Sequence, residues 1–274
     1  MILVAGGTGR LGTLVTSRLS ARGLDVRVLT RDAARADHLR GVAADIVEGD
    51  VRVPDDVDAA VRGVTTVVSA VQGFDGPGRV TPESVDRAGN VHLIDAAGAA
   101  GADVVLMSTV GASADSRLEL FRAKHAAEEH LRASSVSWTI VRATAFVELW
   151  AEIMEKPLVF GRGDNPINFV SVNDVAAVVE RAVVDPGLRG HVLEVGGPDN
   201  VTFNELAVIL QQSRGVDGSL RHIPRWLLHT MAPVSRRARA AIAMDTVDLT
   251  FTPSTGYPAT DIRTALSANT DVST

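Results

Sequence analysis

The first half of the chain alternates short apolar runs with stretches in which apolar residues recur at helical spacing. The apolar runs predict strands at residues 2–5, 25–30, 45–48, 65–70, 103–108 and 137–142. Most of these runs are apolar at both odd and even positions, which is typical of strands buried on both faces of a parallel sheet. Between the first two strands, Leu11, Val15 and Leu19 recur at helical spacing, and Gly23 stands where that helix would end.

Strands joined by helical crossovers specify the α/β class. The expected architecture is a doubly wound parallel sheet of the Rossmann type, whose ligands bind beyond the carboxyl ends of the strands.

Composition narrows the classes of function. Hydrophobic residues make up 46% of the 274 residues and charged residues 22%, which indicates a compact globular protein. The net charge of −6 gives no basic field for nucleic acid, and the absence of cysteine excludes disulfides, thiolate metal sites and thiol nucleophiles. Met1 leads directly into an apolar run without a basic leader, and no apolar run approaches the ~18 residues of a membrane span. We therefore expect a cytoplasmic protein with neither nucleic-acid nor membrane partners.

A glycine-rich segment, residues 6–12, follows the first strand and opens the first helix. Glycines at these positions permit a tight turn and close approach of a pyrophosphate, which the N–H groups at the helix start then face. An ordinary turn between strand and helix is the alternative, but strand, loop, helix and position agree on a dinucleotide site. The expected cofactor contacts are Gly6, Thr8, Gly9, Arg10, Leu11 and Gly12.

The Gly-x-x-Gly-x-x-Gly spacing of this segment resembles the extended and atypical short-chain dehydrogenase/reductase superfamily. The resemblance to the superfamily continues at Glu48-Gly49-Asp50, Ser69-Ala70-Val71-Gln72 and Met107-Ser108-Thr109-Val110. Further segments resemble its NmrA-like branch, namely Lys124 with Glu128, Trp138-Thr139-Ile140-Val141-Arg142, Asn173-Asp174-Val175-Ala176 and Gly196-Gly197-Pro198. The resemblance covers almost the whole chain. It implies that Asp50 and Val51 border the adenine, and that Ala70, Val71 and Gln72 border the ribose and nicotinamide side. It also implies that Thr144, Ala145 and Phe146 contact the cofactor where the acceptor pocket lies over the nicotinamide.

The strand rhythm loosens after residue 142 and resumes briefly near residue 170. We expect an NAD(P)-binding Rossmann domain at residues 1–143 and 170–197. Two inserts, residues 144–169 and 198–274, should form a smaller substrate-binding region.

The end of the second strand indicates which coenzyme is used. Thr30 and Arg31 stand where an acidic residue would hold the ribose of NAD. A guanidinium suits a 2′-phosphate, so NADP is favoured over NAD. Asp32 keeps NAD possible, although a helix-capping role fits this residue better.

Catalysis is predicted mainly by resemblance. Most members of the superfamily use a Tyr-x-x-x-Lys pair; Lys124 matches the lysine, but Leu120 occupies the tyrosine position. The resemblance implies that Lys124 is a catalytic residue that holds the ribose hydroxyls and can donate a proton. It also implies that Ser108 or Thr109 supplies the catalytic hydroxyl, with Ser108 also touching the cofactor. The alternative for Lys124 is an exposed residue paired with Glu128 at i,i+4.

No metal site is expected. His125 and His130 are five residues apart, so they do not share a helix face, and both are expected at the surface.

The missing phenol bears on the substrate. Reduction of an isolated ketone forms a strongly basic alkoxide that needs a positioned acid, whereas a quinone, flavin or enone yields a delocalised anion. We therefore expect an NAD(P)H-dependent reductase of a conjugated aromatic or quinone-like small molecule. An apolar wall for this acceptor is expected from Phe74, Phe146, Trp150 and Phe160, for which core packing is the alternative.

Two other functions stay open. One is a non-catalytic NAD(P)-sensing regulator of the NmrA type that acts through a protein partner. The other is a sugar-nucleotide epimerase or dehydratase, which would have to recruit Tyr257, the one tyrosine of the chain.

Overall fold

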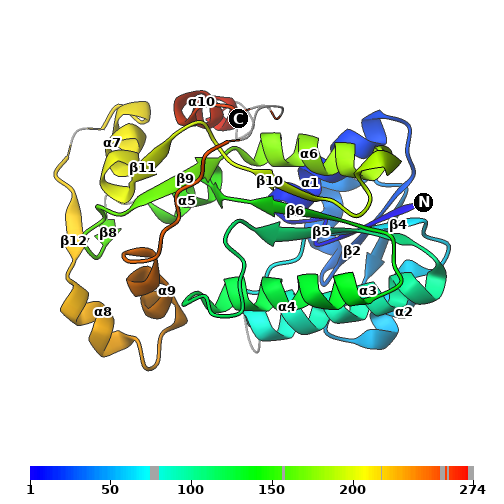
Figure 1. Ribbon diagram of the computed structural model, residues 1–274. Helices are drawn as coiled ribbons and strands as arrows, with labels where there is room; N and C mark the ends of the chain where they lie inside the picture. The colour runs from blue at the N-terminus through cyan, green and yellow to red at the C-terminus, as the bar shows by residue number, and fades with distance from the viewer. Residues whose placement is uncertain (75–79, 156–157, 217, 254–256, 258, 271–274) are drawn as a thin grey trace. The chain divides into compact units, whose positions relative to one another are not determined.

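The computed structural model describes residues 1–74, 80–155, 158–216, 218–253, 257 and 259–270 (Figure 1). The chain divides into two compact units: residues 1–142 with 175–194 form unit 1, and residues 143–174 with 195–274 form unit 2. The expected divisions after residues 143, 169 and 197 lie within five residues of those after 142, 174 and 194. The substrate-binding role of unit 2 stays a prediction.

Unit 1 is built on a seven-stranded sheet with the strand order β10-β6-β5-β4-β1-β2-β3. Its strands are β1 (Ile2–Ala5), β2 (Val26–Thr30), β3 (Asp45–Glu48), β4 (Thr66–Ser69), β5 (Asp103–Thr109), β6 (Trp138–Ala143) and β10 (Val192–Val195). Parallel pairs join β3 to β2, β2 to β1, β1 to β4 and β4 to β5, and Ile2 stands in register with both Val26 and Thr66. The order reverses between β1 and β4, so these two strands flank the switch point where such sheets bind ligands.

Helices cover both faces of this sheet. Figure 1 shows α1 (Arg10–Ala21) and α6 (Val172–Val184) on one face, with α2 (Pro54–Val61), α3 (Ala88–Ala100) and α4 (Glu119–Ala133) on the other. Short helical turns η1 (Ala33–Leu39), η2 (Pro82–Arg87) and η3 (Pro186–Leu188) complete the connections. The predicted doubly wound α/β fold is confirmed.

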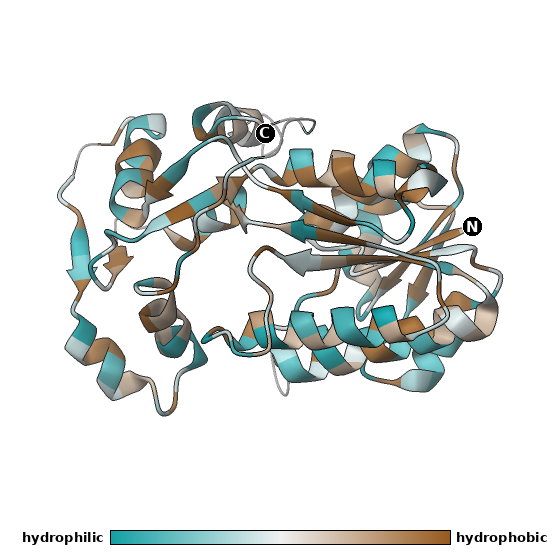
Figure 2. Ribbon diagram, viewed as in Figure 1, coloured by the Kyte–Doolittle hydropathy of each residue, from teal (hydrophilic) through white to brown (hydrophobic). Residues whose placement is uncertain are grey.

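The central strands are buried as their sequence predicts. Every residue of β1 and β4 is buried, since both faces of each strand lie under helices. In Figure 2 the central strands are mostly brown, whereas teal residues gather on the helices. The ends of β1 and β4 are therefore held rigidly by the core.

Unit 2 contains two small sheets with the orders β11-β9-β7 and β12-β8. Its strands are β7 (Ala145–Phe146), β8 (Leu158–Phe160), β9 (Pro166–Val170), β11 (Asn200–Thr202) and β12 (Arg221–Ile223), and its helices are α5 (Val147–Ile153), α7 (Phe203–Ser213), α8 (Arg225–Met231), α9 (Arg236–Met244) and α10 (Ile262–Thr270). A Cβ atom on Gly197 would lie 1.9 Å from the Phe169 carbonyl oxygen, so the Gly196-Gly197 pair serves close packing of this unit.

Among the described residues, none of the helices combines the length and the apolar character needed to cross a membrane.

Candidate functional site

The glycine loop is packed between the ends of β1 and β4 and the start of α1. Gly6 adopts a φ of +79°, and a Cβ atom there would lie 2.8 Å from the Ala70 carbonyl oxygen. A Cβ atom on Gly12 would lie 2.3 Å from the Gly6 carbonyl oxygen. These two glycines are therefore required by the fold itself. Gly9 differs, because it is exposed and its Cβ atom would meet only the Gly6 carbonyl oxygen, at 3.3 Å.

The start of α1 fits a diphosphate. Gly9 is the N-cap and provides no side-chain cap, and the first turn of α1 contains no acidic residue. The N–H groups of Arg10, Leu11 and Gly12 therefore lie at the positive end of the helix without a side-chain oxygen from the N-cap, an arrangement that suits an anion. Thr8 connects this loop to the end of β2, because its hydroxyl lies 3.3 Å from that of Thr30.

The residues after β2 lie at the expected adenosine end. Arg31 is exposed and directly follows the buried Thr30. The carboxylate of Asp32 accepts a hydrogen bond from the Ala34 N–H at 3.0 Å and caps η1. The capping role predicted for Asp32 is thereby confirmed, and Arg31 and Asp32 are both exposed.

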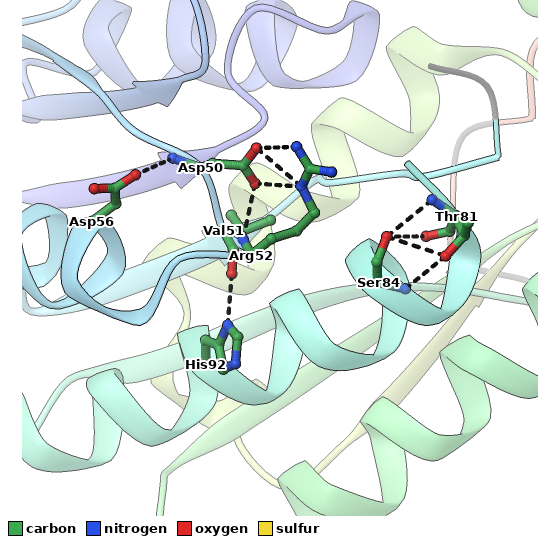
Figure 3. A network of polar contacts seen from close by, with 7 residues as sticks. All are labelled: Asp50, Val51, Arg52, Asp56, Thr81, Ser84 and His92. Carbon is green, nitrogen blue, oxygen red and sulfur yellow. Dashed lines mark hydrogen bonds and ion pairs between the residues drawn. The ribbon is translucent and has the colours of Figure 1, made fainter. Parts of the chain in front are cut away.

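Asp50 belongs to a polar network at the end of β3 (Figure 3). Figure 3 shows its carboxylate facing the guanidinium of Arg52, with Nη2 2.6 Å from Oδ2. The hydrogen bonds of Arg52 lower the pKa of Asp50 despite its partial burial, and the positive charge of Arg31 adds to this effect. The next residue, Val51, accepts a hydrogen bond from Nδ1 of His92 at 2.8 Å, which ties the segment to α3. Sequence reasoning missed Arg52 and His92.

Lys124 is buried, with only 6% of its surface exposed. Its ammonium nitrogen lies 3.0 Å from Oδ1 of Asp86, from the carbonyl oxygen of Val71 and from that of Met107. The alternative of an exposed lysine paired with Glu128 is therefore wrong. Burial raises the pKa of Asp86, although the charge and hydrogen bond of Lys124 act in the opposite direction.

Glu128 forms a second buried polar cluster, beside Ser108 on β5. Its carboxylate is fully buried and accepts from Arg142 at 2.9 and 2.7 Å and from Arg132 at 2.8 Å. Burial raises the pKa of Glu128, but the hydrogen bonds and positive charge of Arg142, together with the hydrogen bond of Arg132, outweigh it, so the pKa lies below its ordinary value. Ser108 itself is buried, whereas Thr109, at the end of β5, is half-buried.

Sequence reasoning missed Asp86, and it missed the partners of Glu128. A signal was available in both cases. Asp86 and Asn90 stand at i,i+4, and so do Lys124 and Glu128, among residues that face the core. Polar residues at that spacing on a buried face need partners inside the protein.

Of the other residues expected near cofactor or acceptor, Gln72, which is exposed, and Phe74 belong to unit 1 and the rest to unit 2. The hydroxyl of Thr144 donates to Oδ1 of Asn168 at 2.9 Å, and Ala145 and Phe146 pair with β9. The ring of Trp150 lies 4.6 Å from that of Phe203, so core packing accounts for Trp150. Phe160 is 36% exposed on β8.

Phe74 is half-buried in unit 1 and precedes residues outside the described part of the chain. The contacts of Phe74, Thr144, Ala145, Phe146, Trp150 and Phe160 with coenzyme or acceptor stay predictions.

The two histidines singled out by the sequence behave differently. Nε2 of His130 lies 2.7 Å from Asp95 at the surface, whereas His125 is half-buried rather than exposed. Within the described ranges, no three His, Asp or Glu side chains gather as metal ligands would.

A switch point lined by a glycine loop defines a dinucleotide-binding protein. The model of the NAD(P)H-binding family matches residues 6–186. The chain belongs to this family, which confirms the resemblance to atypical short-chain dehydrogenase/reductases and identifies NAD(P)H as the cofactor.

Individual relatives agree with this family. The chain is 30% identical over 221 residues to an NAD(P)H azoreductase from Xenophilus azovorans, covering 78% of this chain and 74% of the relative. It is 25% identical over 244 residues to the photosystem II assembly factor Ycf39 from Trieres chinensis, covering 85% of this chain and 75% of the relative. An NADPH-dependent quinone oxidoreductase from Escherichia coli, solved with NADPH, has the same fold, with a TM-score of 0.78 at 21% identity over 98% of this chain and all of the other.

Proposed function

We propose that this protein is an NAD(P)H-dependent reductase that transfers hydride to a conjugated small-molecule acceptor of the quinone, flavin or enone type. The observation that carries the proposal is the state of the Tyr-x-x-x-Lys positions. Leu120 occupies the tyrosine position, and three oxygens within 3.0 Å surround the Lys124 ammonium. Neither position then offers a proton to an isolated alkoxide.

Conjugated acceptors remove the need for that acid. When bound, NAD(P)H supplies a hydride. The anion that forms on a conjugated acceptor is delocalised, and solvent can protonate it. The protein then contributes chiefly by binding and orienting both reactants. The names of the similar azoreductase and quinone oxidoreductase, which specify azo and quinone acceptors, support this class.

We assign the coenzyme contacts to unit 1 as follows. The N–H groups at the start of α1 bind the diphosphate, Arg31 binds the 2′-phosphate, and Asp50 with Val51 borders the adenine. The nicotinamide side is assigned to Ala70, Val71 and Gln72, with Ser108 and Thr109 as hydroxyl groups nearby in the fold. The exposure of Arg31 and the cap formed by Asp32 both favour NADP over NAD.

The proposed acceptor residues are Phe74, Phe146, Trp150 and Phe160, of which Phe146 and Phe160 are the principal candidates. The chief contribution proposed for Trp150 is its packing on Phe203.

A second candidate is an NAD(P)-sensing protein that acts through a protein partner. The similarity to an assembly factor favours it, and so does the fully engaged Lys124. Turnover separates the two functions.

The test is oxidation of NADPH and NADH, followed at 340 nm, in the presence of a naphthoquinone, a flavin and an enone. Acceptor-dependent oxidation is expected for at least one of them. Tight coenzyme binding without any acceptor-dependent oxidation would contradict the reductase and support the sensor.

A further inference from the structure

Two polar side chains one helical turn apart are fully buried beneath the segment that follows β4. Asp86, in η2, and Asn90, in α3, each have 0% of their surface exposed. The turn that carries Asp86 begins at a capping box, in which Ser84 and Thr81 bond reciprocally (Figure 3). The start of this helix is therefore well defined, and its buried polar pair has a fixed position.

Both side chains hold the segment from Ser69 to Gly73. Oδ2 of Asp86 accepts from the Gly73 N–H at 2.8 Å. Asn90 accepts from the Ser69 hydroxyl and donates to the Asp86 carbonyl oxygen at 2.7 Å. Residues 70–72, which we assign to the nicotinamide side of the coenzyme, lie between these two attachment points.

Lys124 supplies a third attachment. Its ammonium joins Oδ1 of Asp86 to the carbonyl oxygens of Val71 and Met107, each at 3.0 Å. The ends of β4 and β5 are thereby tied to each other and to η2. The ammonium donates hydrogen bonds to the two carbonyl oxygens and forms an ion pair with Asp86, so it is held on three sides inside the protein.

We propose that Asp86 is a positioning residue for the coenzyme, which acts with Lys124 to hold residues 71–73 in the conformation that receives the nicotinamide half of NAD(P)H. The inference rests on the proposed function, which places that half of the coenzyme at this segment. Lys124 then acts through the backbone that it holds and does not donate a proton to the acceptor.

Stability alone gives a weak reason for such a pair. Replacing both members of a buried ion pair by apolar residues is often neutral or stabilising, because desolvation of the charges offsets their attraction. A pair that orients two carbonyl groups and an N–H group at a ligand-binding edge has a geometric role that apolar residues cannot fill.

The experiment compares two ligands on the full-length protein. NADPH uses both halves of the site, whereas adenosine 2′,5′-bisphosphate lacks the nicotinamide riboside. The variants are Asp86→Leu with Lys124→Met, which removes both charges together, and Asp86→Asn, which keeps the shape. Glu83→Gln is the control, because Glu83 lies in the same helical turn, is exposed and pairs with Arg87 at 2.8 Å. Circular dichroism and calorimetry report folding and both dissociation constants.

Both variants are expected to bind NADPH at least about tenfold more weakly than wild type, because contacts held by a charged group are lost. Their affinity for the bisphosphate should stay within about twofold of the wild-type affinity. The control should match wild type for both ligands. Equal losses of affinity for NADPH and for the bisphosphate would show that Asp86 has a structural role only, and would overturn the inference. Unchanged affinity for NADPH would overturn it as well.

Failure of the proposed function has a different signature. If wild-type protein binds NADPH but shows no turnover, the proposed reductase activity is contradicted. The comparison of the two ligands still tests the role of Asp86 in that case, because it measures binding alone. Wild-type protein that does not bind NADPH overturns both.

Discussion

Glu128 on α4 and Arg142 on β6 form a two-pronged ion pair in the interior of unit 1, with Nε 2.9 Å from Oε1 and Nη2 2.7 Å from Oε2. The carboxylate is fully buried, and the guanidinium also reaches Glu194 at 3.3 Å. This pair connects the helix that carries Lys124 to the strand next to β5. Its loss should therefore disturb folding before it disturbs coenzyme chemistry.

We expect Glu128→Gln to lower the free energy of unfolding by about 3 kcal/mol at pH 7, because it leaves two arginines facing a neutral group. Chemical denaturation measures this change. The control is Glu129→Gln, at the neighbouring position, where the side chain is 59% exposed and the expected change is below about 1 kcal/mol. Equal changes in the two variants would contradict the assignment of the buried pair.

The same variant should change the pH dependence of stability. The folded-state pKa of Glu128 lies below its ordinary value of 4.5, so ionised Glu128 stabilises the fold above that pH. This stabilisation is lost as the pH falls through the folded-state pKa. The difference between wild type and Glu128→Gln should therefore shrink on acidification below pH 4.5. A difference that stays constant would show that ionisation is not involved.

Gly9→Ala tests the diphosphate site separately from the fold. The backbone of Gly9 has a φ of −79°, which alanine adopts, so the expected loss of stability is below about 1 kcal/mol. NADPH affinity should fall at least about tenfold, because a methyl group would obstruct close approach of the diphosphate. Isothermal calorimetry and thermal melting measure the two quantities.

Gly12→Ala is the matched comparison. Its Cβ atom would lie 2.3 Å from a carbonyl oxygen, so this variant should be destabilised by about 1–3 kcal/mol or more even without coenzyme. If Gly9→Ala binds NADPH with the affinity of wild type, the diphosphate does not lie against Gly9.

Arg31→Glu should separate the two coenzymes. A 2′-phosphate loses a charge-assisted contact and meets a like charge, so NADPH affinity should fall by about tenfold or more while NADH affinity changes by less than about threefold. Arg40→Glu is the control for net charge, because Arg40 is exposed and pairs with Asp37. Equal losses for NADPH and NADH in Arg31→Glu would exclude the 2′-phosphate contact.

Two aromatic residues of unit 2 should respond differently to substitution. Trp150→Ala removes a ring packed 4.6 Å from Phe203 and should destabilise the protein by about 3 kcal/mol.

Phe160→Ser changes a residue that is 36% exposed, so stability should change by less than about 1 kcal/mol while KM for a quinone acceptor rises. An unchanged KM in Phe160→Ser would remove Phe160 from the acceptor site.

Much of the fold was predictable because its strands are buried on both faces. A strand of that kind is apolar at successive positions, which can be recognised without knowing which strands pair with it. Accordingly, β1 spans the predicted residues 2–5. β5 ends one residue later than predicted, and β6 both begins and ends one residue later, because strand ends are set by pairing with neighbouring strands.

The site was predictable only where its chemistry is local. The glycine loop and the cap formed by Asp32 each depend on residues within a few positions of one another. Lys124 was found by resemblance, but its partners were not, since Val71 lies 53 residues away in the sequence and Met107 lies 17 away.

The sequence by itself determined the class of sheet and the glycine loop, because period, spacing and residue identity are properties of neighbouring positions. The tertiary structure alone decided that Lys124 is buried, that Asp86 is its partner, and that Glu128 belongs to Arg132 and Arg142. The physical reason is desolvation: a charged side chain removed from water must find its counter-charge and hydrogen bonds on whichever segments the fold brings beside it.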